Sequence, residues 1–256
     1  MKTSLCGYKG KYEVIVGTVF IRLFPLFVFL LFHTANIFAQ TKMSADVVVR
    51  QLYKNKLIKI QKQIFFTFNG NLVVHYTYPQ EYYMITNSLG ETSVYQPSVN
   101  EVMYITDKTL SSQTEIFSLF VTPNFSDLNL TNLGFVLKST KKEGTNIVKI
   151  FTPTQSIDKN IKQVKVVCKK DQPIYSAFYS KDNRITKKTY YTDYIVFPNI
   201  SFPTVITQIS YDSKGDSVIN KEEFKNIKTS NFPVSSCFNY KIPKGAKRVS
   251  PYSVKK

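Results

Sequence analysis

Tryptophan is absent from this chain of 256 residues, and it has only two histidines, three cysteines and nine glycines. Two histidines cannot supply a histidine-rich metal site, and three cysteines cannot form a four-cysteine zinc cluster. The glycines are scattered singly, so the chain has no glycine-rich loop that could hold a phosphate. The G-x-S-x-G motif of many hydrolases is also missing. These absences argue against the common metal-, nucleotide- and serine-dependent enzymes.

Acidic residues are scarce as well, with 17 Asp and Glu against 34 Lys and Arg, a formal net charge of +17. Such an excess can indicate a nucleic-acid-binding protein. Here the lysines are spread along the whole chain, and no compact basic run is interleaved with aromatic residues. We therefore predict no nucleic-acid partner. The basic residues are expected on a solvated surface, which leaves attraction to anionic lipid headgroups or to an acidic partner open.

Long hydrophobic runs are missing too, with one short exception at residues 23–32, which read LFPLFVFLLF. Lys2, Lys9 and Lys11 precede this run, and small residues follow it up to Ala39. This order is typical of a secretory signal, so we predict that residues 1–39 are a cleaved signal peptide. An uncleaved anchor, with the apolar stretch extended back to residue 14, and a core helix are the alternatives. Cleavage would remove four basic residues and one acidic residue and leave a charge of +14.

Most of the remaining chain shows the two-residue alternation of β-strands, with Asn69-Gly70 as a strong hairpin signal. We expect a mainly β fold, an antiparallel sheet of about 10–11 strands in a single domain over residues 40–249, with 250–256 as a flexible basic tail. Short helices are predicted at 44–56, 112–121 and 126–133. The expected strands are 59–68, 72–78, 82–86, 92–96, 101–106, 134–139, 145–152, 161–169, 173–180, 185–197 and 203–211.

Candidate catalytic groups are few. His75 is the one histidine after the predicted signal, and it falls within a strand, where a place on the sheet surface is more common than a role as a base. Asp171, Asp182 and Asp212 lie at predicted turns, which such residues favour for their own backbone hydrogen bonds. A hydrolase would need a cleft with converging carboxylates, and the sequence selects none. We predict no catalytic residue, no metal and no cofactor, and hence a protein that is not an enzyme.

Several strands carry apolar residues in both phases of the alternation, such as Phe65 with Phe66 and Val73 with Val74. Two interpretations fit this pattern: a sheet covered on both faces, or a curved sheet with one face lining an apolar cavity. The pair Cys168 and Cys237 is similarly open, as either a disulfide or two separate thiols.

Four short segments resemble the LolA family of periplasmic outer-membrane lipoprotein carriers: GNLVVHYTYP (70–79), EYYMITN (81–87), LGETSVYQPSVNEVMYI (89–105) and FNYKIPKGAKRV (238–249). The similarity extends over residues 41–249 and includes the order of a leading helix, a long meander and inserted helices. Six positions fall where the family pattern places such residues: Gly70, Pro79, Tyr83, Gly90, Tyr95 and Pro97.

The resemblance implies a half-open β-barrel with short helices covering its concave face, which carries the acyl chains of a lipoprotein to the outer membrane. The implied partners are an acylated lipoprotein or other lipid cargo, an inner-membrane donor and an outer-membrane acceptor, with the carrier a monomer in the periplasm. The expected cavity residues are Phe66, Phe68, Leu72, Val74, Tyr76, Met84, Val166 and Phe178, and the expected lid residues are Ile116, Phe117 and Phe120.

One position departs from the family pattern. Better-known members have an arginine directly before the strand-ending proline, where it latches the lid, whereas this chain has Tyr78 before Pro79. The resemblance therefore does not extend to that latch. The alternative function is a non-enzymatic module of the cell envelope that binds lipid or glycan on its surface and has no internal cavity.

Overall fold

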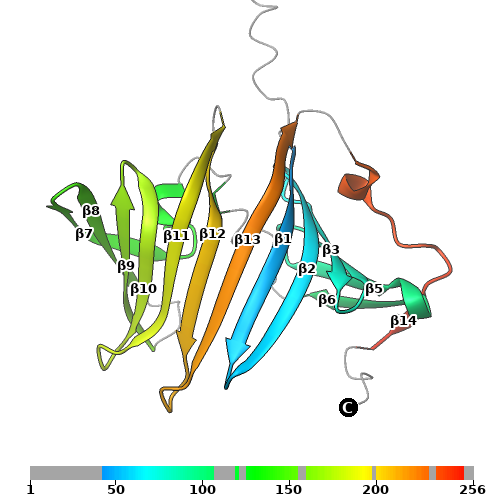
Figure 1. Cartoon of the computed structure of the whole chain (residues 1–256), viewed down its shortest axis with the longest axis horizontal. Helices are drawn as coiled ribbons and strands as arrows, with labels where there is room; N and C mark the ends of the chain where they lie inside the picture. Colours follow the sequence, from blue (N-terminus) through cyan, green and yellow to red (C-terminus); the bar gives the residue numbers. More distant parts are fainter. Residues whose placement is uncertain are drawn as a thin grey trace, which may run out of the picture. The chain divides into compact units, whose positions relative to one another are not determined.

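Fourteen strands of the described residues form one curved sheet whose two edges do not meet (Figure 1). The computed structural model describes residues 42–106, 119–120, 125–154, 160–197, 200–230 and 235–250. The neighbours across the sheet run β14-β6-β5-β4-β3-β2-β1-β13-β12-β11-β10-β9-β8-β7. Every pairing is antiparallel except that of β14 with β6, which is parallel. The predicted mainly β fold with a curved, unclosed antiparallel sheet is confirmed, and the sheet has more strands than the 10–11 predicted.

Two runs of consecutive strands build the two halves of this sheet. The first half consists of β1 (Lys42–Tyr53), β2 (Lys56–Thr67), β3 (Leu72–Tyr78), β4 (Tyr82–Thr86), β5 (Glu91–Gln96) and β6 (Glu101–Thr106). The second consists of β7 (Phe135–Glu143), β8 (Asn146–Pro153), β9 (Ile161–Lys169), β10 (Gln172–Ser180), β11 (Ile185–Phe197), β12 (Ile200–Tyr211) and β13 (Ser217–Ser230), while β14 (Lys247–Val249) returns to the first half. Within each half, neighbours in sequence are neighbours in space, as in a meander.

The pairing of β1 with β13 joins the two halves, and a β-bulge lies within it. Two residues of β1, Ser44 and Asp46, face Lys228 and Lys225 of β13, so β13 carries one extra residue there. The bulge includes Asn226, whose backbone is left-handed and whose Nδ2 donates a hydrogen bond of 2.7 Å to Asp46. The Asp46 carboxylate also accepts a hydrogen bond of 2.8 Å from Nε2 of Gln63 on β2. One carboxylate therefore connects three neighbouring strands.

The helix predicted at 44–56 is wrong, because this segment is strand β1 in the centre of the sheet. Met43, Ala45, Val47 and Val49 are buried while the residues between them are partly exposed, a period of two rather than 3.6. Three consecutive β-branched valines, 47–49, favour the extended backbone. Flanking strands on both sides then supply all the backbone hydrogen bonds that a helix would have formed internally.

Short helices covering the concave face are not found among the described residues, so that prediction is wrong for the part of the chain described. The helical elements there are three single-turn 3-10 helices: η1 (Pro97–Val99), η3 (Phe125–Asp127) and η4 (Ser236–Asn239). Of the predicted helix at 126–133, only the η3 turn forms, and left-handed Leu128 and Asn129 end it. Of the predicted helix at 112–121, only residues 119 and 120 belong to the described part.

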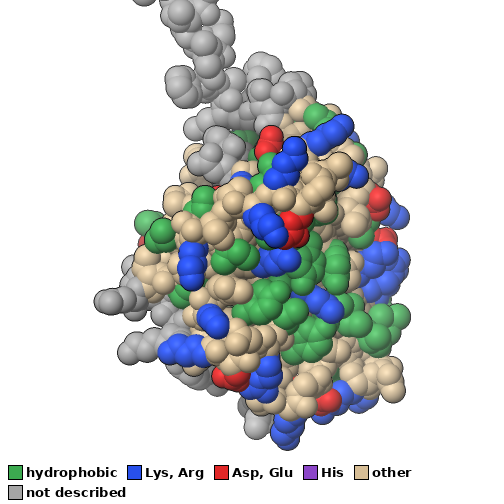
Figure 2. All heavy atoms as spheres, turned by 90° about the vertical axis from the view of Figure 1, so that its left-hand side faces the viewer, with side chains coloured by type: hydrophobic (Ala, Val, Ile, Leu, Met, Phe, Trp, Pro, Cys, Tyr) green, Lys and Arg blue, Asp and Glu red, His purple; other side chains and the backbone are tan. Residues whose placement is uncertain are grey.

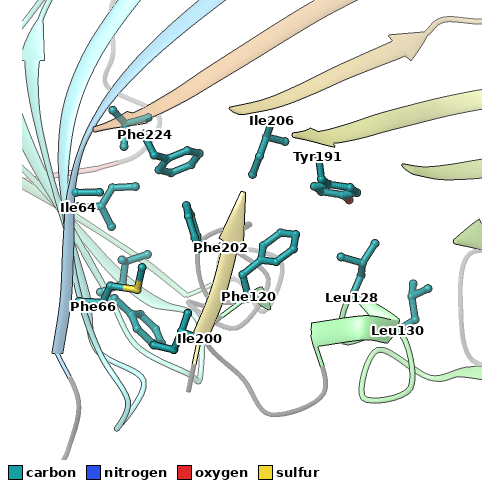
Figure 3. Packing of buried hydrophobic residues seen from close by; sticks show 14 of the residues in the cluster. Ile64, Phe66, Phe120, Leu128, Leu130, Tyr191, Ile200, Phe202, Ile206 and Phe224 are labelled. Carbon is teal, nitrogen blue, oxygen red and sulfur yellow. The ribbon is translucent and has the colours of Figure 1, made fainter. Parts of the chain in front are cut away.

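Buried apolar residues form two clusters. The main cluster includes Val47, Ile64, Phe66, Val74, Val166, Phe202 and Phe224 from the sheet, together with Phe120, Leu128 and Leu130 from the connection between β6 and β7 (Figure 3). We call the sheet face that carries it the inner face. The second cluster consists of Phe65, Val73 and Phe238, with Cys237 and Tyr240 packed at its margin. Because successive residues of a strand face opposite ways, Phe65 and Val73 lie on the outer face, beneath η4.

Both interpretations of the two-phase apolar pattern therefore hold in part. Among the described residues, η4 and the residues after it cover part of the outer face over β2–β4, where the ring centroids of Phe65 and Phe238 are 5.4 Å apart in an edge-to-face contact. The inner face carries the larger cluster, which extends over strands of both halves. In the described part of the chain, the C-terminal segment therefore accounts for the second phase of apolar residues at Phe65 and Val73.

Gly70 occupies the predicted Asn-Gly hairpin and cannot be replaced without strain. Its φ is +91°, and an added Cβ would lie 3.0 Å from the Cβ of Ser88. We expect Gly70→Ala to lower the free energy of unfolding by about 2–3 kcal/mol. The matched control is Gly144→Ala, with φ +61° and nothing within 4 Å of the added Cβ, which should cost only about 1 kcal/mol. If urea denaturation shows the same loss of unfolding free energy for both variants, the steric part of this prediction is contradicted.

Candidate functional site

A pocket of about 420 Å³ opens on the inner face, beside the main cluster. Its volume lies within the range of roughly 300–1,000 Å³ that is usual for small-ligand sites. The apolar wall consists of Leu119, Leu128, Leu130, Leu133, Val164, Phe178 and Ile206. The polar wall consists of Ser176, Lys187, Thr189, Tyr191, Gln208, Asn220 and Glu222. The lining thus divides into aliphatic side chains and polar or charged ones, and the two kinds adjoin each other on the sheet, as Phe178 and Lys187 do.

The sheet register explains this division. Along β12 the inner-face positions pass from buried Phe202 and Ile206 to Gln208, so apolar side chains give way to polar ones. Gln208 pairs with Thr189 of β11 on one side and Asn220 of β13 on the other, which extends the polar row across three strands. Leu128 and Leu130 cover the neighbouring apolar part of the same face (Figure 3). The pocket therefore lies where the apolar core ends and the polar row begins.

Most polar groups of the pocket are paired within the protein. The hydroxyls of Ser176 and Tyr191 are 3.1 Å apart, and complete burial raises the pKa of Tyr191 to about 12. Glu222 lies 4.0 Å from the ammonium group of Lys62 and accepts a long hydrogen bond, 3.4 Å, from Asn220. These contacts keep the polar wall ordered and place a cation beside Glu222, the carboxylate among its described residues.

Lys187 is the exception. Its side chain is half-buried, and its Nζ lies 4.0 Å from the centroid of the Phe178 ring, a cation–π contact. Loss of hydration on burial lowers the pKa of Lys187. None of the ion pairs found among the described residues involves it. Lys187 is therefore a partly dehydrated cation at an apolar surface.

The predicted cavity residues mostly share the inner face but not the pocket. Phe66, Leu72, Val74 and Val166 are buried in the main cluster, and Tyr76, Met84 and Phe178 pack against it. Phe68 is 40% exposed and contacts only the edge of Phe66 among the ring contacts described. Phe178 is the predicted residue that lines the pocket.

Of the predicted lid residues, Phe120 is buried in the main cluster against Tyr191, Tyr194 and Phe202. Ile116 and Phe117 lie outside the described residues. The polar wall was missed by the sequence prediction, which followed apolar residues only. The signal available was the change along β11 and β12 from apolar to polar residues in one phase of the alternation.

Cys168 and Cys237 are free thiols, so the disulfide interpretation is wrong. Cys168 is buried in the main cluster on the inner face, and Cys237 packs against the second cluster on the outer face. The sheet itself therefore separates the two sulfur atoms. Burial raises the pKa of the Cys168 thiol, which donates a hydrogen bond of 3.4 Å to the carbonyl of Ser126.

His75 and Tyr78, both singled out from the sequence, lie on β3 away from the pocket-lining residues. The His75 ring stacks on Tyr83 at 4.2 Å, and its Nε2 is 2.9 Å from Glu81, as expected for a residue on the sheet surface. Tyr78 is 49% exposed at the end of the strand. A latch through an arginine at this position has no equivalent here.

Basic side chains are dispersed over the face of the molecule drawn in Figure 2. In Figure 2 lysines and arginines are scattered among hydrophobic side chains and outnumber acidic ones, without gathering into one block. Within the described ranges, no group of His, Cys, Asp and Glu has a metal-binding arrangement. The same ranges contain no helix that is long and apolar enough to span a bilayer.

Comparison with solved structures places this fold beside LolA-like proteins. A LolA superfamily protein from Nitrosomonas europaea superimposes with a TM-score of 0.52 at 15% identity, over 75% of this chain and 87% of that one. A DUF1329 family protein from Desulfovibrio piger superimposes with a TM-score of 0.53 at 13% sequence identity, over 77% of this chain and 88% of that one. A putative outer membrane lipoprotein-sorting protein domain from Vibrio parahaemolyticus superimposes with a TM-score of 0.52 at 10% sequence identity, over 77% of this chain and 89% of that one.

These structures define the class: the chain has a LolA-like fold, as its sequence resemblance predicted. At identities of 10–15% the similarity concerns the fold alone. No family model matches the sequence, and no curated protein is similar to it.

Proposed function

We propose that this protein is an exported, non-enzymatic carrier that binds acyl chains in the inner-face pocket and transfers them through the periplasm to the outer membrane. The cargo in this proposal is an acylated lipoprotein or another lipid, received from an inner-membrane donor and delivered to an outer-membrane acceptor. Residues 1–39 act as the cleaved signal. The predicted cavity residues on β2–β4 form the apolar floor next to the pocket, and Phe120 with its neighbours forms the cover.

One observation carries the proposal: a pocket whose leucine-rich wall adjoins the main cluster while its other wall is polar. An acyl chain gains about 0.8 kcal/mol for each CH₂ group that leaves water, so an apolar wall of this kind competes with aggregation. The polar side allows the chain to leave again without first unfolding the site. The LolA-like fold, shared with a lipoprotein-sorting protein domain, supports the same function.

A neutral acyl probe tests the proposal. Protein purified from cells that express the full chain is titrated with hexadecanol, which displaces a fluorescent fatty-acid analogue from the pocket. We expect saturable binding with one acyl chain per pocket, insensitive to salt because the burial is apolar. The alternative, an envelope module that uses its surface without a cavity, predicts no displacement and salt-sensitive binding to anionic vesicles. That second result would reject the carrier.

A further inference from the structure

We propose that Lys187 binds the anionic head group, a carboxylate or a phosphate, of a single-chain amphiphile held in the inner-face pocket. This inference rests on the proposed function, because it names the class of acyl ligand that the same pocket accepts. The pocket volume, about 420 Å³, is near the lower end for small-ligand sites and so suits one chain. The observations that carry it are the surroundings of Lys187.

Lys187 lies at the boundary between the two walls. On β10, its neighbour across the strand pair is Phe178, the aromatic member of the apolar wall. Two residues further along β11 is Thr189, buried and facing Ser176. A head group at the Lys187 ammonium would thus have hydroxyl groups within the same polar row, and its chain would start against Phe178. This is the order of groups in an acyl chain with a charged end.

Glu222, the carboxylate among the described pocket-lining residues, does not form an ion pair with Lys187. Lys187 pairs with Ser210 of β12, whereas Glu222 of β13 pairs with Ile206 of β12. Four residues along β12 correspond to about 13 Å at the usual strand rise, and a further strand separates the two side chains. Glu222 instead faces Lys62 at 4.0 Å. The acidic group is therefore matched elsewhere.

Burial removes water from the Lys187 ammonium group, which disfavours the charged form and lowers the pKa of Lys187. The cation–π contact with Phe178 offsets part of this cost. A carboxylate or phosphate from a ligand would supply the missing negative charge in a partly dehydrated site, where such charge-assisted hydrogen bonds are strongest. An uncharged alcohol of the same length would gain the apolar burial but not this contact.

The test compares ligands that differ only in the head group. Palmitate, palmitoyl lysophosphatidate and hexadecanol are titrated into the protein purified from cells expressing the full chain. We expect at least one of the two anions to bind about tenfold more tightly than hexadecanol. A preference for palmitate identifies a fatty-acid carboxylate as the source, and a preference for lysophosphatidate identifies a lipid phosphate.

The variant Lys187→Met keeps the aliphatic length and removes the charge, so it should abolish the preference for the anionic ligand over hexadecanol. The matched control is Lys188→Met on the same strand, since Lys188 points to the opposite face and lies over the ring of Tyr211. Lys187→Arg, which keeps the charge, should retain the preference. Circular dichroism and thermal unfolding confirm that each variant is folded.

The possible failures are distinguishable. If hexadecanol binds but neither anion binds more tightly, or if Lys187→Met keeps the preference, the head-group proposal is overturned and the carrier function stands. If none of the three ligands binds, both proposals fall.

Discussion

Leu119→Gln is expected to weaken the binding of hexadecanol by about tenfold. Leu119 lines the apolar wall of the pocket and is only half-buried, at the margin of the main cluster. An acyl chain bound there would then lie against an amide group that has lost its water, at a cost of about 1–3 kcal/mol. The neutral ligand keeps Lys187 out of the comparison.

The matched control is Leu89→Gln, the same change at a leucine that is 67% exposed and does not line the pocket. Its affinity for hexadecanol should equal that of the unmodified protein. Isothermal titration measures both affinities, and urea denaturation checks that Leu119→Gln loses less than about 1 kcal/mol of stability. Unchanged affinity in Leu119→Gln would show that acyl chains do not enter this pocket.

Phe202→Ala is expected to give the largest loss of stability, about 3–5 kcal/mol. The Phe202 side chain is fully buried at the centre of the main cluster. The centroid of its ring lies 5.0 Å from that of Phe224 and 5.8 Å from that of Phe120, and both contacts are edge to face. Phe202 therefore connects strand β13 with the segment that covers the inner face. Removal of the ring leaves a cavity that these rigid neighbours cannot fill (Figure 3).

Val196→Ala serves as the control on the adjacent strand β11, because Val196 is 73% exposed and should change the free energy of unfolding by less than about 0.5 kcal/mol. Chemical denaturation followed by tyrosine fluorescence measures both variants. A loss below about 1 kcal/mol in Phe202→Ala would contradict the central packing role of this ring between β13 and Phe120.

Local sequence was sufficient to predict most strands between Lys56 and Thr106. Each of these strands ends at a residue with its own turn chemistry, such as the Asn69-Gly70 hairpin, where Gly70 donates its N–H to the Thr67 carbonyl at 2.9 Å. Their partners are the next strands along the chain, so the information that fixes them is close in sequence. The same holds for β8 to β12.

Strands β1 and β13 could not be predicted in the same way. Val48, Val49 and Leu52 of β1 also fit a helical face, and β13 carries Glu222, Phe224 and Ile227 in a pattern that a strand without a bulge would not produce. The bulge at Asn226 returns Ile227 to the inner face, where it packs against the main cluster. Both strands depend on partners far away in the chain.

The candidate site shows the same limit. Apolar alternation placed Phe66, Leu72 and Val74 on one buried face, and this is observed. The pocket forms farther along the sheet, where β10 to β13 bring Lys187, Gln208 and Glu222 into neighbouring rows. No segment of the sequence contains that arrangement, because it arises from the register of four strands.

The sequence by itself determined the β class, the local hairpins, the dispersed charge and the resemblance to LolA-like carriers, since these depend on composition and on neighbours along the chain. The tertiary structure decided that the sheet stays unclosed, that Cys168 and Cys237 lie on opposite faces, and where the pocket forms. The physical reason is distance along the chain: the contact between Asp46 and Asn226, which unites the two halves, joins residues 180 positions apart. Such pairing depends on the whole sheet being assembled.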